Sequence, residues 1–381
     1  MQEMMGRIFP MRGAHPAVFA ADRQAGLKAS RLWRYEEALK SFAWAAECVH
    51  VEGLKMKHDP AIDAAIRRMA RPWWPRRRTV GRSGRLRVAH VHPYFLDNGG
   101  HTSGVLGFLA YHDRERFQVC GIGLELVDSR IYGPRALSHV ERLQVPYYAL
   151  SPESSCLDRV RALYRMLDDV DVAVFYPCER DVISPFVAAM RPKCLTIMYD
   201  TNNLYFNVGP YCFDWHLDTT PEVFDACSHL GAGQTRFKYS TWFPDYFAAE
   251  AARADAVPRQ ELGLDPLGVV SITVGQIFKL QHQQCPDYWD FLERLLQQAP
   301  ELTHVLVGHH PDADGFRATL HARYGDRVRW LGIRRDVPAV LKRWTSTSTA
   351  SPPEADAPCG RRWRRVCPRS AWPIGGTTSI E

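Results

Sequence analysis

The sequence lacks the features that would place the chain in a membrane, outside the cell or around a zinc ion. Its ten cysteines form no Cys-x-x-Cys pair, and most of them lie in apolar segments. That usage is typical of reduced thiols in a cytosolic protein. The N-terminus has no apolar core like that of a signal peptide, and no run approaches the ~18 apolar residues of a membrane helix. These absences predict a cytoplasmic protein without a membrane span.

The sequence also lacks a continuous basic surface, although its net charge is +6. The excess is concentrated in two places, Arg71–Arg87, which contains no acidic residue, and Arg361–Arg369. Two separate clusters argue against a nucleic-acid partner. The first cluster indicates a basic linker between domains over residues 71–84, and a contact with phosphate or an acidic partner is the alternative.

The length of 381 residues and the apolar content of 46 % predict two or three domains with sizeable cores. Residues 1–70 have the pattern of helices. Within them, apolar residues recur with a period near 3.6 at Tyr35, Ala38, Leu39, Phe42, Ala45 and Ala46. This stripe fits either an ordinary amphipathic helix or a degenerate tetratricopeptide repeat, and both interpretations stay open.

From residue 86 onward, apolar strands alternate with helical segments. The expected strands are 86–92, 117–124, 170–176, 194–199 and 215–219, followed by 269–274, 303–307 and 328–331. Alternation at this spacing predicts an α/β fold with two Rossmann-like domains, one over 85–250 and one over 256–343. Two such domains in series form a cleft at the carboxyl ends of their strands.

Two segments far apart in the chain have the chemistry of nucleotide binding. One is an apolar run, 269–274, which is followed by Gln276 and Lys279. The other is a Gly-rich turn near the C-terminus with the residues Gly375, Gly376, Thr377, Thr378 and Glu381. A lysine facing the N–H groups of such a turn is a common way to hold a diphosphate.

Four motifs in order make the chain resemble the two-Rossmann-domain (GT-B) glycosyltransferases, and among them the O-linked N-acetylglucosamine transferase-like family with tetratricopeptide helices before the catalytic part. The motifs are strand 86–92 with its His101-Thr102-Ser103 loop, Met190-Arg191-Pro192, Gln276–Leu280 and Gly375–Glu381. The resemblance implies a nucleotide-sugar donor, a UDP sugar, together with a protein or glycan acceptor and no metal. It also assigns donor contacts to Gln276, Lys279 and the Gly375 turn.

The acceptor hydroxyl needs a base, and His101 in the Gly-rich loop is the first candidate, with Asp97 and His92 behind it. The family has its loop histidine one place earlier, at the position of Gly100. His101 could equally be a loop-bonding residue, and Lys279 a solvated lysine. A non-catalytic protein-interaction module and a sugar-nucleotide epimerase of the same fold are the alternative functions. The segment from Asp218 to Glu222 has the pattern of a helix cap.

After Lys342 the alternating pattern ends. Residues 344–381 are rich in Ser, Thr, Pro and Arg without periodic apolar positions, which predicts an irregular tail. A shift of reading frame near Arg343 would produce such a segment, and a low-complexity linker is the competing interpretation. On the first interpretation the second domain is incomplete and truncated, and the activity of this exact chain is in question.

Overall fold

The structure is a computed structural model, and it describes residues 16–52, 58–73, 84–97, 99–200, 206–218, 236–239, 246, 255–275, 280, 288–308, 312–334, 336–337 and 339–341. Its first sheet has seven parallel strands in the order β3-β2-β1-β4-β5-β6-β7. These are Tyr147–Ala149, Phe117–Gly123, Leu86–His92, Val172–Phe175, Leu195–Asp200, Trp215–Asp218 and Arg236–Tyr239. The order reverses between β1 and β4, as in a doubly wound Rossmann-like domain.

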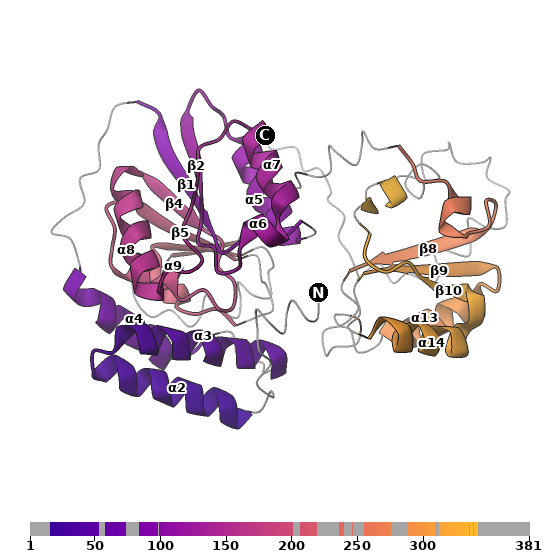
Figure 1. The fold of residues 1–381 in the computed structure, drawn as a ribbon, viewed down its shortest axis with the longest axis horizontal. Helices are drawn as coiled ribbons and strands as arrows, with labels where there is room; N and C mark the ends of the chain where they lie inside the picture. The colour runs from indigo at the N-terminus through magenta and orange to yellow at the C-terminus, as the bar shows by residue number, and fades with distance from the viewer. Residues whose placement is uncertain are drawn as a thin grey trace, which may run out of the picture.

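Helices cover both faces of this sheet, because parallel strands are joined by crossovers that cannot lie in the sheet plane. Figure 1 shows α5, α6 and α7 on one face and α8 and α9 on the other. Their bounds are Gly100–Tyr111, Ser129–Tyr132, Pro134–Arg142, Cys156–Met166 and Ile183–Ala189, and short 3-10 turns are Leu167–Asp169 and Pro210–Cys212. The strand interiors, such as Val88–His92 in β1, are buried as this layering requires.

The second unit has a three-stranded parallel sheet in the order β10-β9-β8 within the described residues. The strands are Val328–Trp330, Leu302–Val307 and Val269–Val274, the helices α13 and α14 are Tyr288–Gln298 and Ala313–Tyr324, and the 3-10 turns are Arg259–Leu262 and Gly325–Arg327. This is one βαβαβ half of a Rossmann-like domain. Together the two parallel sheets confirm the predicted α/β class.

Three helices precede the first sheet: α2 (Pro16–Arg31), α3 (Tyr35–Glu52) and α4 (Pro60–Ala70), followed by the 3-10 turn Arg71–Trp73. α2 and α3 form a close hairpin, in which a Cβ atom on Gly26 would come within 2.5 Å of the Phe42 ring. α3 packs on α8, and α4 packs on α9. The helices therefore share one hydrophobic core with the first sheet, and Phe42 and Phe186 both belong to it.

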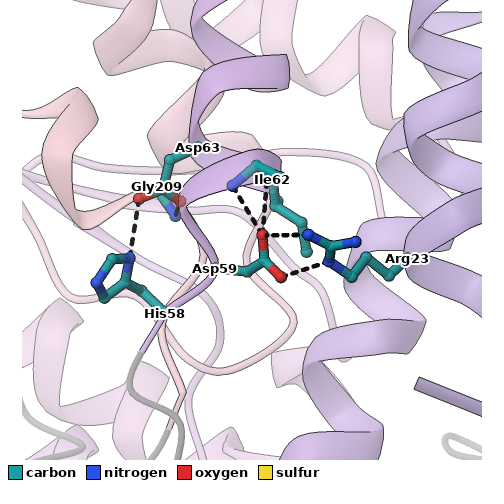
Figure 2. A network of polar contacts seen from close by, with 7 residues as sticks. Arg23, His58, Asp59, Ile62, Asp63 and Gly209 are labelled. Carbon is teal, nitrogen blue, oxygen red and sulfur yellow. Dashed lines mark hydrogen bonds and ion pairs between the residues drawn. The ribbon is translucent and has the colours of Figure 1, made fainter. Parts of the chain in front are cut away.

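Polar contacts attach the same helices to the first domain. Figure 2 shows Asp63 of α4, which is buried and accepts a 2.9 Å hydrogen bond from the Gly209 N–H, while His58 lies 3.4 Å from its other oxygen. Asp59 caps α4 through the N–H groups of Ala61 and Ile62 and forms an ion pair with Arg23 of α2. Each buried carboxylate thus has partners that offset its loss of hydration.

The glycine-rich stretch 99–103 differs from the prediction, which placed His101, Thr102 and Ser103 in a loop. Helix α5 begins at Gly100, and the Ser103 N–H donates to the Gly99 carbonyl as in a helical first turn. Thr102 fixes this start, because its Oγ1 accepts the Leu96 N–H at 2.9 Å. Within the described ranges, every helix lacks either the length or the hydrophobicity to span a bilayer.

Candidate functional site

The candidate site lies at the carboxyl edge of the first sheet, between β1 and β4. β1 ends at His92, and β4 ends at Phe175. The crossovers from these two strands leave on opposite faces of the sheet, and doubly wound domains bind their ligands in the crevice that forms at such a switch point. Two parts of the chain meet there: the first turn of α5, which contains His101, and Tyr176, the residue that follows β4.

His101 is in the first turn of α5 and contacts β4 directly. Its Nε2 lies 3.1 Å from the Tyr176 carbonyl oxygen, which can only accept a hydrogen bond. Nε2 therefore carries the proton, and Nδ1 has the free lone pair. Nδ1 is buried and has no hydrogen-bond partner among the described residues. Burial lowers the pKa of His101 to about 4, against the opposing effect of the Tyr176 backbone, so the imidazole is neutral at pH 7.

His92, at the end of β1, lies beside His101, with 6.5 Å between the ring centroids. It stacks on Phe95 at 3.9 Å and on Tyr147 at 5.7 Å. Burial, and to a smaller extent the nearby His101, lowers the pKa of His92 to about 3. The two neighbouring imidazoles are thus both uncharged at neutral pH, which removes the repulsion that two imidazolium ions would have.

Tyr176 contacts His90, which in turn contacts His112. Its hydroxyl lies 2.7 Å from His90 Nδ1, and His90 Nε2 lies 2.8 Å from His112 Nε2. These contacts fix the ring and with it the carbonyl that orients His101. Sequence reasoning missed His90 and Tyr176 as site residues. A signal was present, because His90 and His92 alternate with apolar residues in one strand and so point to the same face of the sheet.

Glu125 supports the wall of the site next to His92. It follows β2, has a φ of 50°, and is buried. Its carboxylate accepts hydrogen bonds from the Ser129 N–H at 2.7 Å and from the Tyr147 hydroxyl at 3.2 Å. Burial raises the pKa of Glu125, and the hydrogen bonds from Ser129 and Tyr147 oppose that rise. Glu125 thereby positions Tyr147, on which His92 stacks.

Asp97 has a structural role in the observed arrangement. Its Oδ1 accepts the N–H groups of Arg135 and Ala136 at 2.9 and 3.1 Å, so it caps the start of α7. A carboxylate in this position interacts favourably with the helix dipole. The predicted catalytic role of Asp97 stays a prediction, and the structure brings His101 together with His92 and Tyr176 instead.

The predicted donor contacts lie outside the described residues. This applies to Gln276 and Lys279 and to the whole Gly-rich turn, with Gly375, Gly376, Thr377, Thr378 and Glu381. The described part of that region ends with β8 and Gly275, whose N–H donates to the Val307 carbonyl at 2.9 Å. The donor-binding assignments therefore stay predictions.

A separate group of potential metal ligands lies at the ends of β5 and β6.

No protein-family model matches the chain, and no curated protein sequence does either. Similar solved structures include a mutant O-GlcNAc transferase from Thermobaculum terrenum, with a TM-score of 0.49 and 15 % identity over 84 % of this chain and 62 % of that chain. A glycosyltransferase from Rickettsia africae has a TM-score of 0.47 and 10 % identity, covering 67 % and 70 % of the two chains.

The UDP-GlcNAc 2-epimerase from Neisseria meningitidis, bound to UDP-GlcNAc, is also similar, with a TM-score of 0.41 and 12 % identity over 68 % of this chain and 75 % of that chain. The chain spans less than two thirds of the Thermobaculum transferase. The similar structures thus include two transferases and one epimerase, and all three TM-scores are below 0.5.

Proposed function

We propose that the chain is a glycosyltransferase that moves a sugar from a nucleotide sugar, UDP-linked, to a hydroxyl of a protein or glycan. One observation carries the proposal: a neutral histidine with a fixed tautomer, His101, lies at the point where the strand order of the first sheet reverses. Such a group can accept a proton from a hydroxyl that is bound in the crevice.

The proposed reaction forms a bond between the acceptor oxygen and the anomeric carbon of the sugar and breaks the bond from that carbon to the diphosphate. The hydroxyl proton moves to Nδ1 of His101. An imidazole with a pKa of about 4 is a weak base, but the negative charge of a bound diphosphate raises the pKa of a nearby histidine. Lys279 and the N–H groups of the Gly375 turn would stabilise the departing diphosphate without a metal.

Replacing His101 by glutamine tests its role as the base. Glutamine keeps a donor for the Tyr176 carbonyl but cannot take up a proton, so we expect His101→Gln to lower turnover ~100-fold or more, within the range for general-base catalysis. The affinity for UDP should change less than threefold. Transfer of radiolabelled sugar from UDP-N-acetylglucosamine to protein measures turnover, and calorimetry measures the binding of UDP.

His321→Gln is the matched control, because His321 is an exposed histidine on α14. It should leave both quantities unchanged. Equal losses of UDP affinity and turnover in His101→Gln would assign His101 to binding or structure. A chain that binds UDP but converts the sugar without transferring it would be an epimerase, and a chain that does not bind UDP would be a protein-interaction module.

A further inference from the structure

The strand pairing of β5 and β6 places three polar side chains on one face of the first sheet. Asp200 pairs directly with Asp218, and His216 lies two residues before Asp218 in the same strand. Paired residues of parallel strands point to the same face, and so do residues i and i+2 of one strand. The three side chains are therefore brought together by the pleat at the carboxyl edge of the sheet.

Their ligand atoms are close enough for one ion. The three atoms lie within 4.8 Å of one another. His216 Nε2 is 3.0 Å from Asp218 Oδ1 and 3.8 Å from Asp200 Oδ2. Donor atoms around a tetrahedral zinc ion with bonds of about 2.1 Å are separated by roughly 3.4 Å, which lies between these two distances.

Burial makes this arrangement costly without a cation. The relative exposures of Asp200, His216 and Asp218 are 2 %, 1 % and 0 %. Two carboxylates and one imidazole carry a net negative charge in either protonation state of the histidine. Buried charges in proteins are paired or bind metals, because each ion loses several kcal/mol of hydration when it is buried.

A second observation is independent of the spacing of the three groups. Oδ2 of Asp218 is fully buried and accepts no hydrogen bond within the described part of the chain. The same holds for Oδ1 of Asn207, whose amide nitrogen donates to Asp200 Oδ2 at 3.0 Å. Native structures rarely leave buried oxygens without a partner. Asn207 thus resembles the outer groups that orient metal-binding carboxylates.

We propose that Asp200, His216 and Asp218 bind a divalent transition-metal ion such as Zn²⁺ through one nitrogen and two carboxylate oxygens. A mixed set of imidazole and carboxylate ligands suits Zn²⁺ better than Mg²⁺, which binds through oxygen alone. The ion would join the ends of β5 and β6. The three ligands are on other strands than the site around His101, so the metal proposal does not depend on the proposed sugar transfer.

The competing explanation is a protonated His216 between the two carboxylates. Burial lowers the pKa of His216, but Asp200 and Asp218 outweigh it and raise the pKa to about 9. An imidazolium would neutralise part of the negative charge without any metal. The two explanations predict different responses to Zn²⁺. If the three side chains form a metal site, one equivalent of Zn²⁺ binds and displaces the proton from Nε2.

The full chain, stripped of metal with a chelator, can be titrated with ZnCl₂ at pH 7.5 in a calorimeter. We expect one equivalent to bind, with release of a proton visible as a dependence of the heat on the buffer. Asp218→Asn keeps the shape of the side chain but removes its charge, and it should weaken this binding at least tenfold. Zn²⁺ should raise the melting temperature of the wild type and not of Asp218→Asn.

His321→Gln, which removes an exposed histidine far from β5 and β6 in sequence, is the control and should bind Zn²⁺ like the wild type. The absence of binding at one equivalent would overturn the proposal in favour of the imidazolium. So would unchanged binding by Asp218→Asn, because the ion would then be held elsewhere, for example by cysteines. If Asp218→Asn does not fold, as judged by circular dichroism, Asp200→Asn serves with the same expectations.

Discussion

At the scale of single residues, we expect the strongest contact to the donor to come from one positively charged side chain. Lys279, which follows the end of β8, is predicted to contact the diphosphate of the nucleotide sugar. Lys279→Ala should weaken UDP binding by ~1.5–3 kcal/mol, the range for hydrogen bonds to charged groups, which is roughly a 10- to 150-fold rise in the dissociation constant. Calorimetric titration with UDP measures this change.

Lys238→Ala, which removes an exposed lysine of β7, is the control for a general loss of positive charge. It should leave the affinity for UDP unchanged. The same affinity in Lys279→Ala as in the wild type would exclude Lys279 from the donor site and leave it a solvated lysine.

The sequence could predict which histidine to test but not its chemical state. His101 follows a strand and two glycines, and this pattern made it a candidate. Its tautomer depends on the carbonyl of Tyr176, a residue 75 positions away, and its pKa depends on burial by residues of several elements. Asp97 shows the same limit, because its N–H partners are in α7. Local sequence carries no information about such long-range partners.

At the scale of elements, Glu36 of α3 caps a helix to which it is not adjacent in sequence. Its carboxylate accepts the N–H groups of Cys156 and Leu157 at 3.1 and 2.9 Å, at the start of α8. Glu36→Ala should lower the free energy of unfolding by ~1 kcal/mol, the usual value for a lost cap. Urea denaturation followed by circular dichroism measures the loss.

The neighbouring Glu37 gives a matched control. It pairs with Arg34 on the surface, and both side chains are more than half exposed. Exposed pairs contribute little to stability, so Glu37→Ala should change the free energy of unfolding by less than ~0.5 kcal/mol. Equal losses in the two variants would mean that Glu36 acts through helix propensity in α3 and not as the cap of α8.

Most long elements of the fold could be predicted, because buried parallel strands are apolar runs and helices have a 3.6-residue period. The strands β1, β2, β4, β5, β6, β8, β9 and β10 all lie where the apolar runs predicted them, within two residues. The short strands Tyr147–Ala149 and Arg236–Tyr239 and the helices α6 and α7 were missed. Tyr147–Ala149 lies at the sheet edge and includes exposed residues, so it has no apolar run to reveal it.

The sequence pattern also could not predict that α2, α3 and α4 pack against the first domain. Their apolar stripe predicted helices but not the surface that buries it. The contacts of Asp63 with Gly209 and of Glu36 with Cys156 join residues more than 100 positions apart. The tetratricopeptide interpretation of these helices stays a prediction.

At the scale of the whole molecule, buried neutral histidines make stability depend on pH. Burial lowers the pKa to about 3 for His92 and to about 4 for His101 and His304, and lowers that of His90 well below its usual value. In the unfolded chain these groups titrate near 6.5. Below pH 6.5 the unfolded state therefore binds more protons than the folded state, and the free energy of unfolding falls as the pH falls towards 4.

Asp181 acts in the opposite direction over part of this range. Burial raises its pKa to about 6, so its contribution to stability is full below the unfolded value near 3.9 and is lost as the pH rises through 6. Each titrating group changes the free energy of unfolding by at most ~1.4 kcal/mol per pH unit. Burial also raises the pKa of Glu125 and of Asp63, so these carboxyls oppose the histidines as Asp181 does. The four histidines carry the larger shifts, and we expect a net fall in the free energy of unfolding between pH 6.5 and pH 5.

Urea denaturation at several pH values between 6.5 and 5 measures this loss, with tryptophan fluorescence as the signal. The His304→Gln variant isolates one contribution, because His304 is in the second unit, where its ring contacts Ser271 and Tyr288. Its stability should fall less steeply with acid than that of the wild type, by up to ~1.4 kcal/mol per pH unit. Identical slopes for the two proteins would show that His304 takes up its proton equally well in the folded chain, and the burial argument would then fail for that residue.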